Sequence, residues 1–441
     1  MSRTSDHPVS DFVHSLGLDA YLVGGAVRDE LLGRTAKDRD FVVPGVGYEA
    51  LRTALSPHGK VEDLEVAGQR VGLRLFPRDG SLRALAPAGI EFAPPRTERS
   101  TGPGRHDFEI VASPDVTLQQ DMARRDFTIN AIAKRLATGE LLDPFHGEDD
   151  LRAGVLKTVS EQSFREDPLR LVRGLRFVSE HDLEPDAPTL AQMREEAASV
   201  RLVSGERIGG GLTADGMGEL SKLLLGARPA KALRLARDTG VLVELLPEFV
   251  PALGTHDEHI FAVVQETADA GARLEVRLAA LVHDLGKPDT PGPEHAEAGA
   301  RIAANVLRRL RYPTRVRRHV VRLVAAHSFT PEADATAARR FLAEHGDALA
   351  FDLAEHKLSD LRAKDDDTSD AEAFTRLLVE ESAQPHRLSD LAIGGRELME
   401  LGMPAGPGVG RALDALLERV LEEPELNTRD RLLEEARRLP R

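Results

Sequence analysis

Three acidic residues near the N-terminus are candidates for metal-assisted chemistry on phosphates. Asp38 and Asp40 flank a single residue and stand directly before the apolar run Phe41–Val43. Alternate residues of a strand face the same side of a sheet, so we expect both carboxylates to converge. Converging carboxylates suit Mg²⁺ bound to a nucleoside triphosphate, and Glu91, at a second strand-like position, can complete the site. An isolated Asp-x-Asp is more often an exposed turn, so the prediction depends on its surroundings.

A Gly-Gly turn before the two aspartates strengthens this prediction. The stretch YLVGGAVRDELLGRTAKDRDFVV begins at Tyr21, and its short apolar strand leads into Gly24 and Gly25, with a helix expected from Ala26. Glycines let backbone N–H groups approach a phosphate closely, and a helix N-terminus favours anions. The turn alone fits a plain strand-to-helix connection. Together with the aspartates it predicts an in-line displacement, in which two metal ions activate a 3′-hydroxyl and stabilise the leaving pyrophosphate.

A run of polar residues further along can bind the nucleotide. Arg124 and Arg125 precede an expected apolar helix and can clamp triphosphate oxygens. Asp126 and Asn130 are four residues apart, so they would share a face of that helix and suit ribose hydroxyls. The same residues also fit a surface ion-pair network.

The stretch REDPLRLVR can select the base. Asp167 and Arg170 are three residues apart at an expected helix start, with Pro168 in the first turn. A carboxylate accepts hydrogen bonds and a guanidinium donates them, which matches the amino group and unprotonated ring nitrogen that cytosine and adenine share. Uracil and guanine would leave polar groups unsatisfied, at about 1–3 kcal/mol each. Taken alone, the pair fits a helix-capping acid with an i,i+3 salt bridge better.

The motifs GGAVRD, DRD, RRDFTINAIA, DPFHGEDDL and REDPLRLVRGLRF resemble, in order and spacing, those of the bacterial-type (class II) tRNA nucleotidyltransferase and poly(A) polymerase family. The resemblance implies Mg²⁺ in the head, CTP and ATP as substrates, and tRNA lacking part or all of its CCA end as the partner. In that family the pattern Glu-Asp-x-x-Arg selects the base, and Glu166, Asp167 and Arg170 match it. The nucleotide-binding residues it implies are Gly24, Gly25, Arg28, Arg124, Arg125, Asp126, Asn130, Asp167, Arg170 and Arg173.

A second group of possible metal ligands lies further along the chain. The stretch LAALVHDLGKPDTPGPEH resembles the signature of HD-domain phosphohydrolases, and the candidate ligands are His283, Asp284, His295, His327 and Asp360. Imidazole and carboxylate ligands together suit Mn²⁺, Ni²⁺ or Zn²⁺, and a bound metal lowers the pKa of water for phosphoester hydrolysis. The alternative is an HD fold kept as a helical scaffold.

One position departs from the HD pattern. The family usually has a metal-binding His directly before a Thr in the first helix of this domain, where this chain has Glu266 before Thr267. Glutamate can bind metal, and His256 or His259 can substitute for the missing histidine.

The elements that would position these residues change in type near Leu151. Short β-like runs alternate with helical patterns before it, and the spacing of apolar residues is helical almost throughout after it. We therefore predict an α+β fold: a polymerase-β-like nucleotidyltransferase head with a mixed or antiparallel sheet, followed by an all-α neck, body and tail. The expected domains are 1–150 (head), 151–248 (neck, selecting the base and binding RNA), 249–365 (HD-like) and 366–441 (tail).

The composition limits the class of protein and its expected location. The 441 residues are 41% hydrophobic and 30% charged and include no Cys, which is typical of a globular protein and excludes disulfides and cysteine metal sites. We find no signal core and no apolar run that could span a bilayer, so we expect a cytoplasmic monomer or homodimer without a membrane partner. The net charge of −15 argues mildly against binding nucleic acid. The arginine-rich stretch from Arg308 to Arg322 nevertheless offers local positive surface, although it also fits a solvated helix face.

The leading interpretation is a CCA-adding tRNA nucleotidyltransferase. The long polar segment from Arg96 to Asp121 favours full CCA addition, because family members that add only CC resemble the others but have a shortened loop there. The alternatives are a poly(A) polymerase or a partial (CC- or A-adding) enzyme of the same family, a metal-dependent HD phosphohydrolase acting on RNA ends, and a non-catalytic RNA-binding module.

Overall fold

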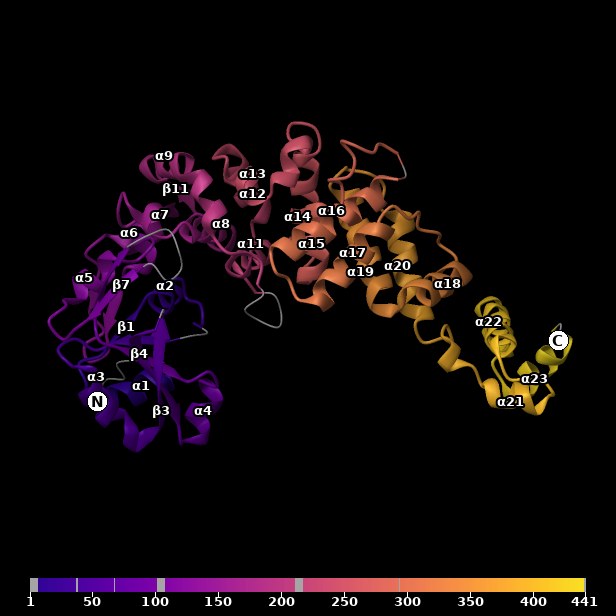
Figure 1. Ribbon diagram of the computed structural model, residues 1–441, viewed down its shortest axis with the longest axis horizontal. Helices are drawn as coiled ribbons and strands as arrows, with labels where there is room; N and C mark the ends of the chain where they lie inside the picture. Colours follow the sequence, from indigo (N-terminus) through magenta and orange to yellow (C-terminus); the bar gives the residue numbers. More distant parts are fainter. Residues whose placement is uncertain are drawn as a thin grey trace. The chain divides into compact units, whose positions relative to one another are not determined.

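The computed structural model describes residues 7–36, 39–66, 68–100, 108–210, 217–292 and 294–439. The chain divides into two compact units, Met1–Pro247 and Glu248–Arg441, which Figure 1 colours from indigo to magenta and from magenta to yellow. The strands of the described chain all belong to the first unit, and the described part of the second is helical. This arrangement confirms the predicted α+β fold class. None of the helices within the described ranges has the length and apolar character needed to cross a membrane.

A seven-stranded mixed sheet forms the base of the first unit, in the order β3-β4-β5-β2-β1-β8-β9. Only the β2–β5 pair runs parallel in this sheet. The strands are β1 (Tyr21–Val23), β2 (Asp40–Val42), β3 (Gly59–Val66), β4 (Gln69–Pro77), β5 (Ile90–Ala93), β8 (Ala133–Arg135) and β9 (Leu141–Leu142).

Alternation along the strands places apolar side chains on both faces of the sheet. Leu22 and Phe41 lie in one core, where Phe41 stacks on Phe92 with ring centroids 5.7 Å apart. Their neighbours Val23 and Val42 lie in a second core on the other face. The first core is covered by α1 (Pro8–Ser15), α2 (Gly25–Leu31), α3 (Tyr48–Leu55) and α4 (Gly80–Leu85). Burial on both faces fixes the register, because a one-residue slip would exchange the two sets.

The remainder of the first unit is mostly helical and surrounds α8 (Leu169–His181), which is buried at nine of its positions. Phe127 packs against it, with its ring centroid 5.7 Å from that of Phe177. The other helices are α5 (Leu118–Ala123), α6 (Gly147–Arg152), α7 (Ser163–Glu166), α9 (Ala187–Glu196), α10 (Gly205–Ile208), α11 (Glu219–Leu225), α12 (Pro229–Asp238) and α13 (Val241–Leu245). Two small sheets pair β6 (Arg96–Ser100) with β7 (Phe108–Ala112), and β10 (Val155–Leu156) with β11 (Glu184–Pro185).

The helix expected after Arg125 is absent from the structure, so that prediction was wrong. Phe127 is extended and forms an isolated bridge with Thr158, and only the short 3₁₀ turn Thr128–Asn130 follows. The extended backbone at Phe127 places its ring against α8, and a residue in that conformation cannot lie within a helix.

The second unit is built around α15 (Leu274–Val282), all nine residues of which are buried. A helix with all of its residues buried must be enclosed by neighbours, and this one is packed against by α14 (Asp257–Asp269), α16 (His295–Arg309), α17 (Thr314–Ala326) and α19 (Asp347–Arg362). The helices of this unit are α14 (Asp257–Asp269), α16 (His295–Arg309), α17 (Thr314–Ala326), α18 (Ala335–His345), α19 (Asp347–Arg362), α20 (Ser369–Glu381), α21 (Gly395–Glu400), α22 (Pro407–Glu422) and α23 (Arg429–Arg438).

Candidate active site

Two carboxylates lie side by side on the central strands of the sheet. The parallel pairing of β2 and β5 sets Asp40 opposite Glu91. On the neighbouring strand Arg74 is opposite Glu91 and donates to its Oε1 at 2.5 Å. Asp40 is exposed and Glu91 is partly exposed, so a cation can reach both. Asp38, the other predicted ligand, lies outside the described residues.

A cavity of about 1460 Å³ opens beside these carboxylates and belongs entirely to the first unit. Its described lining includes eleven Arg and Lys side chains against seven Asp and Glu side chains. The volume exceeds that of ordinary small-molecule pockets, about 300–1,000 Å³. The net charge of the chain argued against binding nucleic acid, but the lining of this cavity has an excess of positive charge. A bound anion would contact the lining, so the local charge matters more than the net charge.

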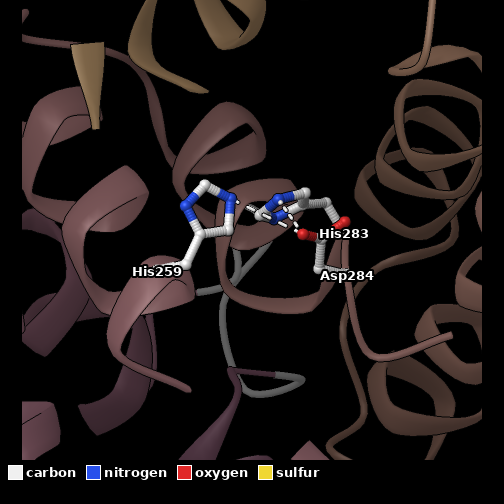
Figure 2. A group of neighbouring side chains, drawn as sticks. All are labelled: His259, His283 and Asp284. Atoms are coloured by element: carbon white, nitrogen blue, oxygen red, sulfur yellow. Dashed lines mark ion pairs between the residues drawn. The ribbon is translucent and has the colours of Figure 1, made fainter. Parts of the chain in front are cut away.

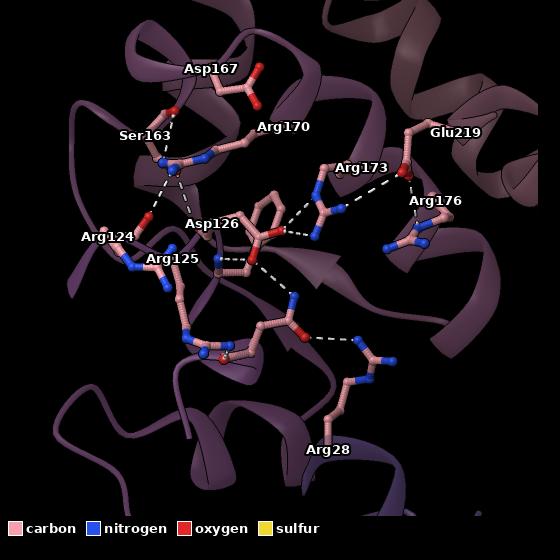
Figure 3. Close-up of polar contacts among 12 residues, drawn as sticks. Arg28, Arg124, Arg125, Asp126, Ser163, Asp167, Arg170, Arg173, Arg176 and Glu219 are labelled. Carbon is pink, nitrogen blue, oxygen red and sulfur yellow. Dashed lines mark hydrogen bonds and ion pairs between the residues drawn. The ribbon is translucent and has the colours of Figure 1, made fainter. Parts of the chain in front are cut away.

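Asp126 is the buried centre of a polar network on one wall of this cavity (Figure 3). Its carboxylate accepts hydrogen bonds from Asn130 Nδ2 at 2.9 Å and from Arg173 Nη2 at 2.6 Å. Burial alone would raise the pKa of Asp126, but the charge of Arg173 and these hydrogen bonds outweigh it and lower the pKa. Asp126 therefore remains a carboxylate at neutral pH and holds Asn130 in a fixed orientation.

The adjacent arginines are held by a different buried acid. Asp121 Oδ1 accepts from Arg124 Nη2 at 2.8 Å, and its Oδ2 lies 3.3 Å from Arg125 Nη2. Arg125 also donates to the Asn130 carbonyl at 3.2 Å, and Arg28 donates to the Asn130 side chain at 2.8 Å. Three arginines from two separate segments thus converge on one wall, and the predicted residues Arg28, Arg124, Arg125, Asp126 and Asn130 are brought together.

Gly24 permits this convergence. Its φ of +70° is a left-handed conformation, and a Cβ added here would lie 2.6 Å from Arg125 Nη1. Any other residue would therefore be strained and would displace the guanidinium.

Asp167 and Arg170 both line the cavity, but they do not form the i,i+3 pair considered from sequence. Asp167 is paired with Arg207, with Nη2 and Oδ2 2.8 Å apart. Arg170 reaches the other way, donating to the Arg124 carbonyl at 2.7 Å and to Glu166 at 2.9 Å. Figure 3 shows the Asp167 carboxylate and the Arg170 guanidinium pointing away from each other. Asp167 also caps that helix through the Leu169 N–H.

His181 and Arg176, which the sequence did not single out, also line the cavity, and Glu219 lies beside them. His181 stacks on Phe177, and burial together with Arg28 and neighbouring arginines lowers its pKa to about 3. Arg176 pairs with Glu219 at 3.1 Å, and Arg173 lies 3.7 Å from the same carboxylate. The contacts of Arg173 and Arg176 with Glu219 join segments far apart in the sequence, and no local motif signals them.

A second polar cluster lies in the interior of the other unit, where α15 ends at His283 and Asp284 (Figure 2). His259 of α14 lies 3.5 Å from Asp284 Oδ2, and His283 Nε2 lies 3.2 Å from the same oxygen. Asp360 of α19 is 3.1 Å from His259. Burial lowers the pKa of His283, which favours the neutral ring that binds metals.

Family comparisons account for most of the chain. The family described as "Poly A polymerase head domain" matches residues 20–157, "Probable RNA and SrmB- binding site of polymerase A" matches 182–253, and "HD domain" matches 257–373. A Multifunctional CCA protein of Ralstonia nicotianae is 38% identical over 361 residues, which cover 76% of this chain and 78% of the relative. Another, of Chromobacterium violaceum, is 40% identical and covers 67% of this chain and 71% of the relative. The chain belongs to the bacterial-type CCA-adding tRNA nucleotidyltransferase family.

Solved structures of CCA-adding enzymes agree with this family. The Bacillus stearothermophilus CCA-adding enzyme in complex with CTP matches with a TM-score of 0.71 at 26% identity, covering 98% of this chain and 95% of that one. The Thermotoga maritima CCA-adding enzyme complexed with tRNA matches at 23% identity with a TM-score of 0.60, and covers 98% and 93% of the two chains. At that identity the second likeness shows the fold alone.

Within this CCA-adding family member, the structure answers the question raised by Glu266. Of the two histidines considered as substitutes, His259 lies in the cluster and His256 contacts Thr255 Oγ1 at 2.9 Å instead. Sequence reasoning missed His356, which is fully buried beside His283 with ring centroids 5.0 Å apart. The spacing His-x-x-x-Asp in HKLSD, which puts His356 and Asp360 on one face of a helix, was the available signal.

Proposed function

We propose that the chain is a CCA-adding tRNA nucleotidyltransferase, which transfers CMP and AMP from CTP and ATP to the 3′ end of tRNA without a template. The proposal depends on one observation: Asp40 and Glu91 lie in register beside a cavity with an arginine-rich lining. The 38% identity to a Multifunctional CCA protein supports the choice of reaction.

Asp40 would hold Mg²⁺ together with Asp38, and Glu91 would orient or complete the site. Carboxylate oxygens are the ligands that Mg²⁺ prefers, and Mg²⁺ supplies charge neutralisation for the phosphates and acidity for the attacking hydroxyl. The pairing of Arg74 with Glu91 fixes the latter's orientation on the strand.

Arg28, Arg124 and Arg125 would bind the triphosphate, because guanidinium groups match phosphate oxygens in charge and geometry. Their positions are set by Asp121 and Asn130 rather than by the ligand. Little rearrangement is then needed when the nucleotide enters, which favours catalysis by positioning. Asp126 and Asn130 would lie near the sugar, with Arg173 holding Asp126 ionised.

Asp167 and Arg170 would read the base. Arg207 occupies the Asp167 carboxylate in this structure, so an incoming amino group would replace or share that contact. Binding of C or A then exchanges one hydrogen bond for another. Binding of U or G presents a carbonyl to a carboxylate and leaves both unsatisfied.

The decisive experiment supplies tRNA lacking its CCA end with each nucleoside triphosphate alone and in combination, and identifies the added residues by mass spectrometry. Addition of C, C and A in order is the expected result. Long A-tails on unrelated RNA would identify a poly(A) polymerase, and termination after CC or addition of A alone would identify a partial enzyme. Absence of incorporation and of pyrophosphate release would refute the proposal. The mass of the protein in solution decides between monomer and homodimer.

A second activity is favoured by the buried cluster around Asp284. Six buried side-chain atoms of the described chain lie in or beside it without a hydrogen-bond partner: His259 Nε2, His283 Nε2, Asp284 Oδ1, Asp360 Oδ1 and both ring nitrogens of His356. Such groups are costly to bury unless a cation completes them. We propose a Mn²⁺, Ni²⁺ or Zn²⁺ site that hydrolyses phosphoesters at RNA ends. Release of phosphate from RNA 3′-phosphates, lost in Asp284→Asn and kept in Asp40→Asn, is the test.

A further inference from the structure

Phe177 of α8 is an aromatic ring surrounded by arginines on one wall of the cavity. The guanidinium carbon of Arg176 lies 4.4 Å from the ring centroid, that of Arg28 lies 5.1 Å away and that of Arg173 lies 5.7 Å away. All three are within the distance of about 6 Å over which the face of a ring attracts a cation. Resting on the proposed role of Arg28 as a triphosphate ligand, we infer that Phe177 is a positioning residue, whose ring holds the Arg28 guanidinium in place for the triphosphate.

Arg28 needs an anchor that leaves some of its donors for the nucleotide. Among the described residues, Nε and Nη2 donate to Asp29 Oδ1 at 3.0 and 2.8 Å, and Nη1 donates to Asn130 Oδ1 at 2.8 Å. One N–H group on each terminal nitrogen is then left for phosphate oxygens. An aromatic ring uses no N–H group and carries no net charge, so it attracts the guanidinium without repelling the triphosphate. A further carboxylate in place of the ring would consume a donor and repel the phosphates.

A chain of hydrogen bonds connects Arg28 to the helix that carries the ring. Arg28 donates to the Asn130 side chain, which donates to Asp126 at 2.9 Å. Asp126 in turn accepts from Arg173 Nη2 at 2.6 Å (Figure 3). Arg173 and Phe177 are four residues apart on α8 and share a face of it. Arg28, which comes from α2, is therefore fixed to α8 twice, once through hydrogen bonds at the edge of its guanidinium and once through its charge.

The surroundings of the ring strengthen this attraction. The ring is only 1% exposed although it lines the cavity. Burial lowers the pKa of Arg176 even though Glu219 and Glu180 lie 3.1 and 3.8 Å from its Nε, so little water reaches this guanidinium. The attraction between a cation and a ring is stronger when both are removed from water. His181 stacks on the ring, and burial and nearby arginines lower its pKa to about 3, so it is neutral and adds no further cation.

Packing alone is the competing explanation for Phe177. Its ring meets Phe127 edge-on, with centroids 5.7 Å apart and planes at 87°. A ring that only fills volume needs its shape, whereas a ring that holds Arg28 needs the negative potential of its face. Fluorine atoms on the ring withdraw that potential in steps and change its shape little. Fluorinated phenylalanines therefore separate the two explanations.

The test replaces Phe177 in the full-length protein by phenylalanine with one, two or three ring fluorines. Single-nucleotide addition to tRNA lacking its end gives kcat/KM for CTP, and calorimetry gives the affinity for CTP with Mg²⁺. Both values should fall with each added fluorine, by about 5- to 30-fold across the series. Values equal to those of the wild type throughout the series would overturn the inference and leave Phe177 a packing residue. A wild-type protein that binds CTP but adds no nucleotide would refute the proposed function, and the binding series would still test the ring.

A control position and a second background locate the effect. Phe164 is equally buried, packs against the same Phe127 ring at 6.2 Å and has no Lys or Arg over it among the described residues. Three fluorines at Phe164 should change neither value. In an Arg28→Met background the series at Phe177 should become flat, because the ring no longer has that guanidinium to hold. An undiminished slope there would show that the ring acts through another arginine and would overturn the assignment to Arg28. If circular dichroism shows that the trifluoro form is unfolded, the forms with one and two fluorines still give the slope.

Discussion

Replacement of Asp167 by Asn should weaken the discrimination between CTP and UTP. The variant keeps the shape of the side chain and one acceptor oxygen, and exchanges the other acceptor for a donor. Facing cytosine, the amide meets an amino group and both are donors. Facing uracil, the same amide can donate to the base carbonyl. The change thus removes a favourable contact for C and creates one for U.

The structure sets the size of this effect. Asp167 already uses Oδ1 to accept from the Leu169 N–H at 3.1 Å, which the amide oxygen of Asn can retain. Oδ2 lies 2.8 Å from Arg207 Nη2, and its replacement by NH₂ affects the contact that the base would use. An unsatisfied polar group costs about 1–3 kcal/mol, which is about 5- to 150-fold in an equilibrium or rate ratio. We expect the ratio of kcat/KM for CTP to that for UTP to fall about 10- to 100-fold.

The assay is single-nucleotide addition to tRNA lacking its end, with kcat/KM measured separately for CTP and UTP. Asp186→Asn is the matched control, because Asp186 caps α9 through the Thr189 N–H at 2.9 Å and does not line the cavity. It should leave both values unchanged. An equal loss for CTP and UTP in Asp167→Asn would refute base reading and leave Asp167 a capping residue only.

Four other outcomes are expected. Asp40→Asn should reduce incorporation about 100-fold or more while leaving the unfolding midpoint unchanged, since the lost charge is exposed and metal clamps contribute several kcal/mol. Gly24→Ala should raise KM for CTP, whereas Gly45→Ala, with a similar φ of +72° and no atom near the added Cβ, should lower stability by about 1–2 kcal/mol without affecting KM. Asp126→Asn should lower the free energy of unfolding by about 3 kcal/mol. The folded pKa of Asp126 lies below its unfolded value of about 3.9, so in urea titrations the wild type should lose this contribution as pH falls below about 4. EDTA should lower the thermal midpoint of the Glu248–Arg441 unit, because ions that bind only the folded state stabilise it.

The sequence predicted those parts of the site that short spacings determine. Alternation in a strand was enough to expect Asp40 on a site-facing position, and Asp40 does line the cavity beside Glu91. Asp126 and Asn130 lie together as expected, although they bond to each other, and their contact with a ribose stays a prediction. The helix meant to hold that pair was wrong, because burial of Phe127 outweighed local propensity. The spacing of Asp167 and Arg170 gave no indication of Arg207, since that contact depends on how α10 folds back.

Other parts of the site could not be predicted from local sequence patterns. Lys222 lines the cavity, and Glu219 pairs with Arg176 beside it. Both roles depend on contacts between distant segments, which no local sequence pattern predicts. The substitution at Glu266 obscured the HD pattern until His259, about two turns earlier on the same face of α14, was found in the cluster. Asp38 and residues 101–107 of the segment that favoured full CCA addition lie outside the described residues, and both inferences stay predictions, as do the four domain boundaries.

The complete enclosure of α15 has a consequence for the ions at its end. A helix buried at nine successive positions cannot open by itself, because local opening must expose what neighbouring elements cover. His283 and Asp284 directly follow this helix and are themselves buried, so they inherit that rigidity. A cation that binds here therefore meets two ligands that are already immobile. Ordering these ligands costs the protein little conformational entropy. Selectivity among metals then depends on how well each ion fits ligand atoms of fixed spacing, rather than on ligands that move to suit each ion.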